Sequence, residues 1–471
     1  MIGNVGPVTT AQNFDLVVIG GGPGGYAAAL YGAAAGLTVA VVERDKVGGT
    51  CLHRGCIPAK QFLETATVFR TVSSAREFGV TVDQPSVDFA TAQGRKQRVV
   101  DQLWKGLQSL LKSRKITVFN GTGVLRPGLK VLVDDGTELV GEHVVLASGS
   151  APRTLPGFDI DGRFVLTSDQ LLDLERLPAS AVVVGGGAIG CEFASMMSDL
   201  GTRVTVLEVL PRLLPGCDID VVTVLARSFE KRGIDVRTDV EVRFHAPEGD
   251  TTTVHFGDGE TVTVEMVVMS VGRRPLSETL GGEGTAVEVD ERGFVVVDDH
   301  LRTGEDGVYA LGDLVNTPQL AHVGFAEAIV AVKDMIGENP VAVDHQKVPW
   351  CIYCFPEVAF AGLSEQAARD AGHDVAVSKH RYSANSRAMI VGEPDGLVKV
   401  VAEKMTDGKA GRLLGVHMVG PAVTEQIAEG WLSVNWEATP DDIGQYVHPH
   451  PTLSETFGET VMSLTGRGLH G

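Results

Sequence analysis

Two cysteines five residues apart, Cys51 and Cys56, are the residues of this chain best suited to chemistry. On a regular helix their Cα atoms would lie about 8–9 Å apart, whereas a disulfide tolerates no more than about 7 Å. Pairing therefore needs a distorted turn, which Gly55 and Pro58 can supply. The spacing alone is also compatible with two unrelated structural thiols, so the surrounding elements must decide between the two interpretations.

A nucleotide-binding pattern precedes this segment in the sequence. The apolar residues 14–19 run into Gly20-x-Gly22-x-x-Gly25, and an Ala-rich helical stretch and a second strand ending at Glu43 follow. Such glycines permit a tight turn and the close approach of a pyrophosphate, and the terminal acid can bind ribose hydroxyls. Because strand, turn, helix, strand and acid occur in order, the pattern predicts a dinucleotide site rather than a glycine-rich turn alone.

The same pattern occurs a second time. Gly185-x-Gly187-x-x-Gly190 follows an apolar strand, and the next strand ends at Glu208. Gly185 and Glu208 each lie 165 positions after their counterparts in the first copy. The sequence therefore encodes two nucleotide sites.

Farther along the chain the offset between the copies changes. A hairpin turn at Gly136 and a glycine at Gly149 have counterparts at Gly259 and Gly272, both 123 positions later. The first copy thus carries about 42 additional residues between its acid and its hairpin. Both cysteines lie at the start of this insertion, which favours a redox pair; in a reducing compartment such a pair would be catalytic rather than structural.

Composition narrows the class of protein. Apolar residues make up 44% of the 471 residues and charged residues 21%, a globular balance. The net charge of −20 disfavours nucleic acid and anionic membrane surfaces as partners. The uncharged run 16–42 is long enough to span a bilayer, but its glycine-rich turn argues against a membrane span. No targeting segment is visible at the N-terminus, so we expect a soluble, cytoplasmic protein.

Two further motifs complete the pattern. Residues 309–313 read Tyr-Ala-Leu-Gly-Asp, and residues 448–455 read His-Pro-His-Pro-Thr-Leu-Ser-Glu. Together with the cysteine segment, they resemble the pyridine nucleotide–disulfide oxidoreductases over nearly the whole chain. The resemblance implies an α/β fold with two Rossmann-like domains, which bind FAD and NAD, and a C-terminal α+β dimerisation domain. We expect the FAD domain at 1–150, the NAD domain at 151–275, a central segment completing the FAD domain at 276–345 and the interface domain at 346–471.

The resemblance also assigns the cofactor sites. FAD is expected at the first turn and NAD at the second, where a glutamate favours a free ribose 2′-hydroxyl over a 2′-phosphate. The expected FAD-binding residues are Gly20, Gly22, Gly25, Glu43, Lys60, Gly149 and Asp313. The expected NAD-binding residues are Gly185, Gly187, Gly190, Glu208 and Gly272. Arg212 lies near Glu208 in the sequence and could soften the preference for NAD, although a solvated surface arginine is favoured.

The resemblance gives roles to the catalytic residues as well. Cys51 would exchange with the sulfur of the substrate, and Cys56 would face the flavin. Lys60 would lie near the flavin and pair with Glu192. His450 of the partner subunit would act as the base.

In the same motif, Glu455 would orient the imidazole of His450. His448 is left as a structural or secondary member. The site would thus require a homodimer.

These roles imply an enzyme that oxidises a dihydrolipoyl group to its disulfide and reduces NAD to NADH. Its partner would be a lipoyl carrier domain of a 2-oxoacid dehydrogenase or glycine-cleavage complex. A glutathione-reductase-like enzyme is the nearest rival, but Glu208 opposes the NADP preference of that class. A mercuric reductase would need a cysteine pair after Cys354, and none follows. A non-catalytic flavoprotein subunit is opposed by the complete set Cys51, Cys56 and His450.

Other motifs carry weaker hypotheses. Cys351-x-x-Cys354 with the late histidines could form a zinc site, but residues 350–355 alternate like a strand, and we expect no metal. Arg54, between the redox cysteines, could lower a thiolate pKa and raise the redox potential. Replacing Arg54 by Val would then lower that potential, although a solvated surface role is nearly as well supported.

Overall fold

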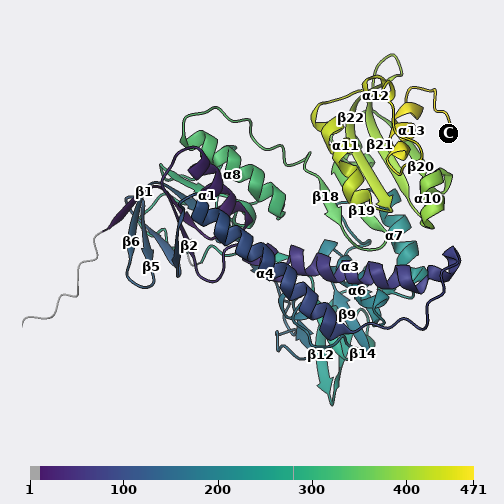
Figure 1. Cartoon of the computed structure of the whole chain (residues 1–471), viewed down its shortest axis with the longest axis horizontal. Coiled ribbons are helices and arrows are strands. Elements are labelled where there is room, and N and C mark those ends of the chain that lie inside the picture. The colour runs from purple at the N-terminus through teal and green to yellow at the C-terminus, as the bar shows by residue number, and fades with distance from the viewer. Residues whose placement is uncertain (1–10, 279, 471) are drawn as a thin grey trace, which may run out of the picture. The chain divides into compact units, whose positions relative to one another are not determined.

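The computed structural model describes residues 11–278 and 280–470 (Figure 1). The chain divides into two compact units. Unit 1 comprises Met1–Gln61, Gln93–Arg153 and Arg273–His345, and unit 2 comprises Phe62–Ala92, Thr154–Gly272 and Gln346–Gly471. Each unit is described by itself below.

Unit 1 is built on a mixed sheet in the order β3-β2-β1-β6-β5-β4, with β17 added beside β6. The centre of its parallel part, residues 16–19 of β1, 39–42 of β2, 144–146 of β6 and 308–310 of β17, is apolar and buried, as expected for a sheet covered on both faces, whereas the edge strand β3 is largely exposed. Helix α1 (Pro23–Ala34) connects β1 to β2, and α8 (Ala321–Met335) packs against α1. The strands are β1 (Gln12–Ile19), β2 (Val39–Glu43), β3 (Thr117–Asn120), β4 (Gly123–Arg126), β5 (Lys130–Val133), β6 (Glu138–Leu146) and β17 (Val308–Ala310).

Between β2 and β3 the chain forms the predicted insertion. It consists of α2 (Gly49–Arg54), α3 (Cys56–Ser73), the 3₁₀ turn η1 (Ala75–Phe78) and α4 (Phe89–Ser113). The two cysteines lie on different helices, because the helical path is broken at Gly55. Of this insertion, Phe62–Ala92 belongs to unit 2 and the rest to unit 1. A two-stranded ladder of β7 (Ser150–Pro152) and β16 (Arg273–Pro275) belongs to unit 1.

Unit 2 contains a second parallel sheet in the order β11-β10-β9-β15-β8. Helix α6 (Ala188–Asp199) follows β9, and α7 (Ile219–Lys231) connects β10 to β11. The strands are β8 (Val165–Leu166), β9 (Ser180–Val184), β10 (Arg203–Leu207), β11 (Asp235–Arg237) and β15 (Met266–Met269). A separate antiparallel sheet is formed by β12 (Val242–Glu248), β13 (Thr251–Phe256) and β14 (Glu260–Val264). The fold thus repeats the nucleotide-binding unit, as the sequence predicts.

The C-terminal part of unit 2 is an antiparallel sheet in the order β18-β19-β22-β21-β20. Val398, Val400, Val416 and Met418 of its central strands are buried under the helices. The strands are β18 (Trp350–Ile352), β19 (Glu357–Gly362), β20 (Val375–Arg381), β21 (Leu397–Lys404) and β22 (Ala410–Gly420). The helices are α9 (Glu365–Asp370), α10 (Ser386–Val391), α11 (Val423–Asn435), α12 (Pro440–Gly444) and α13 (Glu455–Ser463).

One predicted element is shorter than expected. The strand predicted over 350–355 ends at Ile352, because the next backbone groups bond to side chains of α6 rather than to a strand. The N–H of Tyr353 donates to Glu192, and the N–H of Phe355 donates to Ser195. In the part of the chain that the structure describes, no helix is long and apolar enough to cross a membrane.

Candidate active site

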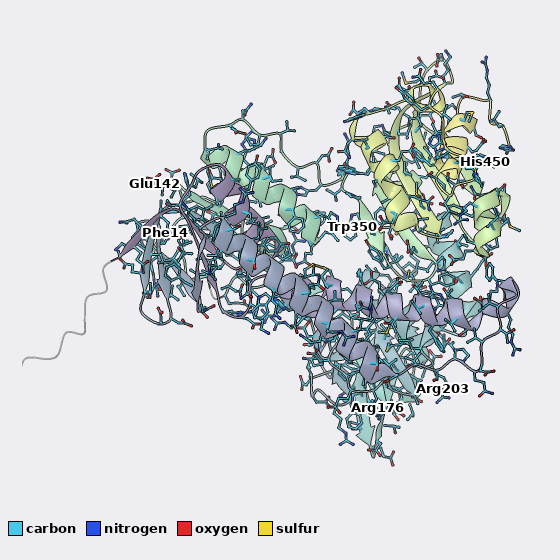
Figure 2. All side chains as sticks on the ribbon, viewed as in Figure 1. Phe14, Glu142, Arg176, Arg203, Trp350 and His450 are labelled. Atoms are coloured by element: carbon cyan, nitrogen blue, oxygen red, sulfur yellow. A yellow bond between two sulfur atoms is a disulfide. The ribbon has the colours of Figure 1, made fainter. Side chains whose placement is uncertain are left out.

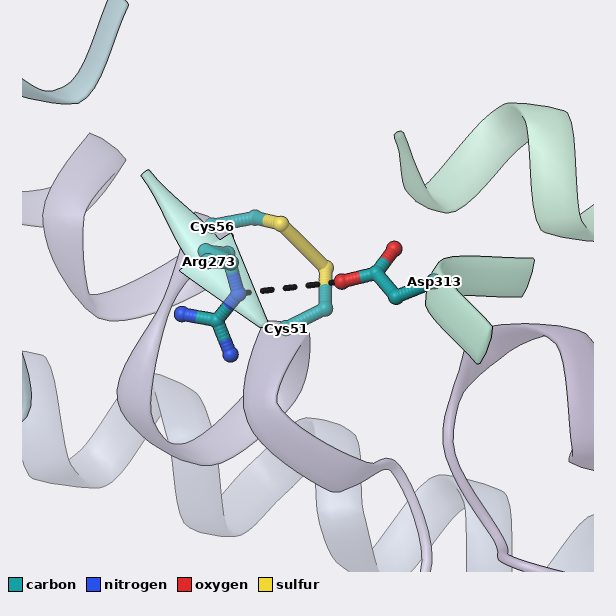
Figure 3. The surroundings of a disulfide bond; sticks show 4 residues. All are labelled: Cys51, Cys56, Arg273 and Asp313. Carbon is teal, nitrogen blue, oxygen red and sulfur yellow. Dashed lines mark ion pairs between the residues drawn. A yellow bond between two sulfur atoms is a disulfide. The ribbon is translucent and has the colours of Figure 1, made fainter. Parts of the chain in front are cut away.

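Cys51 and Cys56 form a disulfide with a Cα–Cα distance of 4.7 Å (Figure 3). The separation is shorter than a continuous helix allows because Gly55 leaves the helical conformation, with φ −142° and ψ −113°. A Cβ atom at Gly55 would lie 3.0 Å from the carbonyl oxygen of Thr50. The predicted distortion is therefore confirmed at Gly55, whereas Pro58 lies inside the first turn of α3, where proline is tolerated.

Two of the four residues between the cysteines, His53 and Arg54, contact the preceding loop. Nε2 of His53 lies 3.0 Å from the carbonyl oxygen of Val47. Arg54 donates to Asp45 at 2.7 Å, and both side chains are about half exposed. The guanidinium charge of Arg54 is thus partly offset, which reduces the effect it can have on the disulfide.

Asp313 lies near the disulfide and is held by two residues that the sequence analysis did not identify (Figure 3). The hydroxyl of Ser150 donates to Asp313 at 2.5 Å, and Nε of Arg273 donates to that hydroxyl at 2.7 Å. Arg273 Nε also lies 3.7 Å from the Asp313 carboxylate. Ser150 and Arg273 directly follow Gly149 and Gly272, the glycines matched by the offset of 123 positions, and this equivalence could have drawn attention to them.

The first glycine turn has the close backbone approaches that are typical of dinucleotide sites. Gly20 has φ +103°, and a Cβ there would lie 2.2 Å from the carbonyl oxygen of Ala147. A Cβ on Gly25 would lie 1.9 Å from the carbonyl oxygen of Gly20, whereas Gly22 faces open space. Glu43 accepts a hydrogen bond from the N–H of Gly21 at 2.7 Å. Because no side chain caps α1, its N-terminus is suited to phosphate.

The second turn repeats this geometry. Gly185 also has φ +103°, a Cβ on Gly190 would lie 1.9 Å from its carbonyl oxygen, and Gly187 faces open space. Glu208 is buried and accepts from the N–H of Gly186 at 2.5 Å. The guanidinium of Arg212 donates to a nearby backbone oxygen at 2.9 Å, in keeping with the favoured surface role.

The C-terminal motif contains two histidine–carboxylate pairs, both within unit 2. His450 lies in the C-terminal part of the chain (Figure 2). Its Nδ1 lies 2.9 Å from Glu455, the first residue of α13, and its imidazole is 69% exposed. Nε2 of His448 lies 2.7 Å from Glu429 on α11. The hydrogen bond with Glu429 raises the pKa of His448 above its ordinary value, against the opposing effect of burial. His450 is thus the more accessible of the two histidines.

The remaining predicted site residues are distributed over the two units. Lys60 lies on α3 in unit 1, one helical turn after Cys56. Glu192 lies buried on α6 in unit 2 and accepts a hydrogen bond from the N–H of Tyr353 at 3.0 Å. The pairing of Lys60 with Glu192 stays a prediction, as does the approach of His450 to the disulfide.

The other cysteines differ from the redox pair. Burial raises the pKa of Cys191, Cys217 and Cys354. Cys354 donates to the carbonyl oxygen of Pro356, whereas Cys351 donates to that of Thr424. Among the described residues there is no group of three or more side chains arranged to hold a metal ion.

Comparison with known proteins identifies the family. Residues 14–328 match the pyridine nucleotide-disulphide oxidoreductase family, and residues 348–461 match the dimerisation domain of that family. A dihydrolipoyl dehydrogenase of Bacillus subtilis is 43% identical over 98% of this chain and all of its own length. A dihydrolipoyl dehydrogenase 2 of Haloarcula marismortui is 38% identical over 99% of both chains. The chain therefore belongs to the pyridine nucleotide-disulphide oxidoreductases.

Solved structures agree with this assignment. LpdA of Mycobacterium tuberculosis superimposes with a TM-score of 0.89 at 27% identity and covers 96% of this chain and 100% of its own. The flavoprotein disulfide reductase RclA of Escherichia coli gives a TM-score of 0.85 at 27% identity, covering 95% and 99%. The predicted fold class is confirmed, and FAD and NAD are the cofactors of the chain.

Proposed function

We propose that this chain oxidises a protein-bound dihydrolipoyl group to its cyclic disulfide and reduces NAD to NADH. The observation that carries the proposal is the Cys51–Cys56 disulfide in the same unit as the first dinucleotide turn. Relatives that align over nearly their whole length and are named dihydrolipoyl dehydrogenase support it. Bound FAD would supply the electron transfer between the dithiol chemistry and the nicotinamide.

The oxidation of the dithiol substrate uses three side chains, those of His450, Cys51 and Cys56. His450 of one subunit takes the proton of a substrate thiol at Nε2, since its Nδ1 faces Glu455. The substrate thiolate attacks the sulfur of Cys51, and the bond from Cys51 to Cys56 breaks, leaving the electron pair on Cys56. The second substrate thiol then attacks the substrate sulfur of this mixed disulfide, its proton passes to the departing sulfur of Cys51, and the lipoyl disulfide closes. The substrate has lost two electrons and two protons, and the cysteine pair has gained the two electrons.

The two glycine turns bind different cofactors. Gly20, Gly22, Gly25 and Glu43 hold FAD, together with Gly149, Lys60 and Asp313, whose carboxylate Ser150 and Arg273 keep in place. Gly185, Gly187, Gly190, Glu208 and Gly272 hold NAD. The buried carboxylate of Glu208 disfavours the additional 2′-phosphate of NADP. Lys60 and Glu192 form an ion pair beside the flavin.

Assembly completes the site. The dimerisation domain supports a homodimer in which His450 of the partner subunit serves the disulfide. The macromolecular substrate is a lipoyl carrier domain of a 2-oxoacid dehydrogenase or glycine-cleavage complex, and the enzyme works in the cytoplasm.

A panel of oxidants tests the proposal. The purified protein is assayed with lipoamide, glutathione disulfide and mercuric ion, each with NADH and with NADPH. We expect turnover with lipoamide and NADH at a rate at least about tenfold above any other combination, because a tenfold rate ratio requires only about 1.4 kcal/mol of discrimination. Preferred reduction of glutathione disulfide by NADPH would contradict the proposal.

A further inference from the structure

Asn385 connects the start of α10 with residues 452–456, which follow His450 and lie about 70 positions later in the sequence. It lies just before α10, and 6% of its surface is exposed. Its side-chain oxygen accepts a hydrogen bond from the N–H of Ala388 at 2.9 Å, which caps the helix. Because that partner can only donate, the orientation of the amide is fixed and its NH₂ group points away from α10.

The NH₂ group of Asn385 reaches three acceptors around the base. It donates to the carbonyl oxygen of Thr452 and to the hydroxyl of Thr456, both at 2.9 Å. It also donates to Oε1 of Glu455 at 3.3 Å. One residue thus contacts both the turn that follows His450 and the first helical turn of α13.

The carboxylate of Glu455 is consequently held on both of its oxygens. Oε1 faces Asn385, and Oε2 lies 2.9 Å from Nδ1 of His450. Since the imidazole is 69% exposed, the packing of this unit leaves it room to rotate, and the carboxylate is what fixes its direction. A carboxylate can orient a histidine only if its own rotamer is fixed.

We propose that Asn385 is a positioning residue for the catalytic base: it fixes Glu455, and through this carboxylate the direction of the His450 imidazole. This inference rests on the proposed function, in which His450 removes the proton of the substrate thiol. Asn385 itself touches neither substrate nor cofactor in this account.

Two substitutions separate positioning from helix capping. Asn385→Ser keeps a hydroxyl that can cap α10 but is too short to reach Thr452 and Glu455. Asn385→Asp also keeps a capping oxygen but places a second oxygen against the acceptors that the NH₂ group now serves. We expect each to lower kcat for lipoamide reduction by NADH between about 10- and 100-fold, part of the 10²–10⁴-fold that a general base contributes.

The same variants should leave a second reaction unchanged. NADH oxidation by ferricyanide does not need the base, so its rate and the flavin content should match the unmodified protein. Ser364→Ala, which removes the cap of α9 in the same domain, is the matched control and should leave both reactions unchanged. Equal losses in both reactions for Asn385→Ser would mean a merely structural role and would overturn the proposal.

A double-mutant cycle gives the decisive readout. If Asn385 acts through Glu455, adding Asn385→Ser to Glu455→Gln should slow lipoamide reduction by less than about 2-fold beyond Glu455→Gln alone. Independent, multiplicative losses would overturn the proposed role. The variant His450→Gln separates a failure of the proposed function from a failure of the proposed role of Asn385. Full lipoamide activity in His450→Gln would refute the proposed function itself. Loss of activity in His450→Gln together with an unaffected Asn385→Ser would refute only the role of Asn385.

Discussion

The two nucleotide-binding copies share a turn and differ in the element that follows it. Gly20 and Gly185 have the same φ of +103°, and a Cβ added at Gly25 or Gly190 would lie the same 1.9 Å from the carbonyl oxygen of Gly20 or Gly185. After the terminal acid, however, the second copy crosses over through α7 alone, whereas the first crosses over through α2, α3 and α4. The turn therefore defines a general dinucleotide site, and the insertion adds the redox-active disulfide to one of the two copies.

The largest expected effect comes from removing the chemistry that only the first copy has. Cys56→Ser should lower lipoamide reduction by NADH below about a thousandth of its value, as expected when a covalent participant is lost. Ferricyanide reduction by NADH should persist, because the second copy is unchanged. The control is Cys351→Ser, which alters a thiol outside the insertion and should keep both reactions. Lipoamide turnover in Cys56→Ser above a tenth of the normal rate would contradict the assignment of the disulfide chemistry to the first copy.

The shared turn offers a matched pair of substitutions. Gly25→Ala and Gly190→Ala each place a methyl group 1.9 Å from a carbonyl oxygen, so each turn must distort. We expect Gly25→Ala to lose flavin on purification. We expect Gly190→Ala to retain flavin but to raise KM for NADH about 10- to 100-fold, equivalent to about 1.4–2.8 kcal/mol. The reverse assignment of defects would mean that the two cofactors are exchanged between the copies.

The copies also differ in how charged groups stabilise them. Lys399 is 1% exposed and contacts Asp218 at 2.9 Å, Asp220 at 2.7 Å and Glu365 at 2.8 Å, joining the start of α7 to β21 and α9. In the first copy, Lys130 and Glu138 form an exposed pair across the β5–β6 hairpin. Buried and exposed pairs should respond very differently to the loss of one partner.

Lys399→Met should therefore destabilise unit 2 by about 3–5 kcal/mol, because it leaves the buried carboxylate of Asp218 without its cation, whereas Asp220 and Glu365 keep Lys379 and Arg369. The matched change in the first copy, Lys130→Met, should cost less than about 1 kcal/mol. Thermal and urea unfolding of both variants provide the comparison. Equal stability losses would show that burial does not distinguish the two sites.

The pH dependence of the Lys399 cluster has a definite sign. Burial by itself raises the pKa of Asp218, but the hydrogen bond and charge of Lys399, the hydrogen bond from the N–H of Asp220 and the nearby His417 together outweigh it and hold the pKa below its ordinary value. The pKa of Glu365 is also lowered, chiefly by the hydrogen bond of this carboxylate with Lys399. A lowered pKa gives stability that is present above the unfolded-state value of about 4 and is lost as pH falls through the folded-state pKa. The stability difference between the unmodified protein and Lys399→Met should thus shrink below about pH 4.

The smallest expected effect is that of replacing Arg54, which lies between the redox cysteines in the insertion of the first copy. Arg54→Val removes a cation and should lower the disulfide redox potential, but Asp45 already offsets much of that charge. We expect a shift of less than about 30 mV, corresponding to 1.4 kcal/mol for two electrons. Equilibration with the NADH/NAD couple measures it. A shift well above 30 mV would show that the Asp45 pair does not screen Arg54.

Local spacing in the sequence was sufficient to predict some features of the site and not others. The glycine turns and the His450–Glu455 pair involve near neighbours, or backbone geometry that glycine permits, so their spacing identifies them. The contacts of Ser150 with Arg273, and of Asn385 with Thr452, join residues 123 and 67 positions apart. The matched glycines could mark the positions of Ser150 and Arg273, but no pattern in the sequence shows that these side chains bond to each other, and nothing in it marks Asn385.

The strand predicted at 350–355 illustrates the same limit. Its alternating pattern is correct as far as Ile352, but the side chains of Glu192 and Ser195 on α6 then take the backbone N–H groups that a neighbouring strand would otherwise bind. A sequence pattern cannot show this competition, because the competing acceptors lie about 160 residues earlier in the chain.

Mapping of reactive thiols tests the central claim most directly. The protein is reduced anaerobically with dihydrolipoamide, alkylated under native conditions and analysed by peptide mass spectrometry. We predict that Cys51 and Cys56 become alkylated only after reduction. If NAD is added before the alkylating reagent, both cysteines should again be protected, and one NADH should form for each disulfide restored. Alkylation of both cysteines before reduction, or NADH formation while they stay oxidised, would contradict the account.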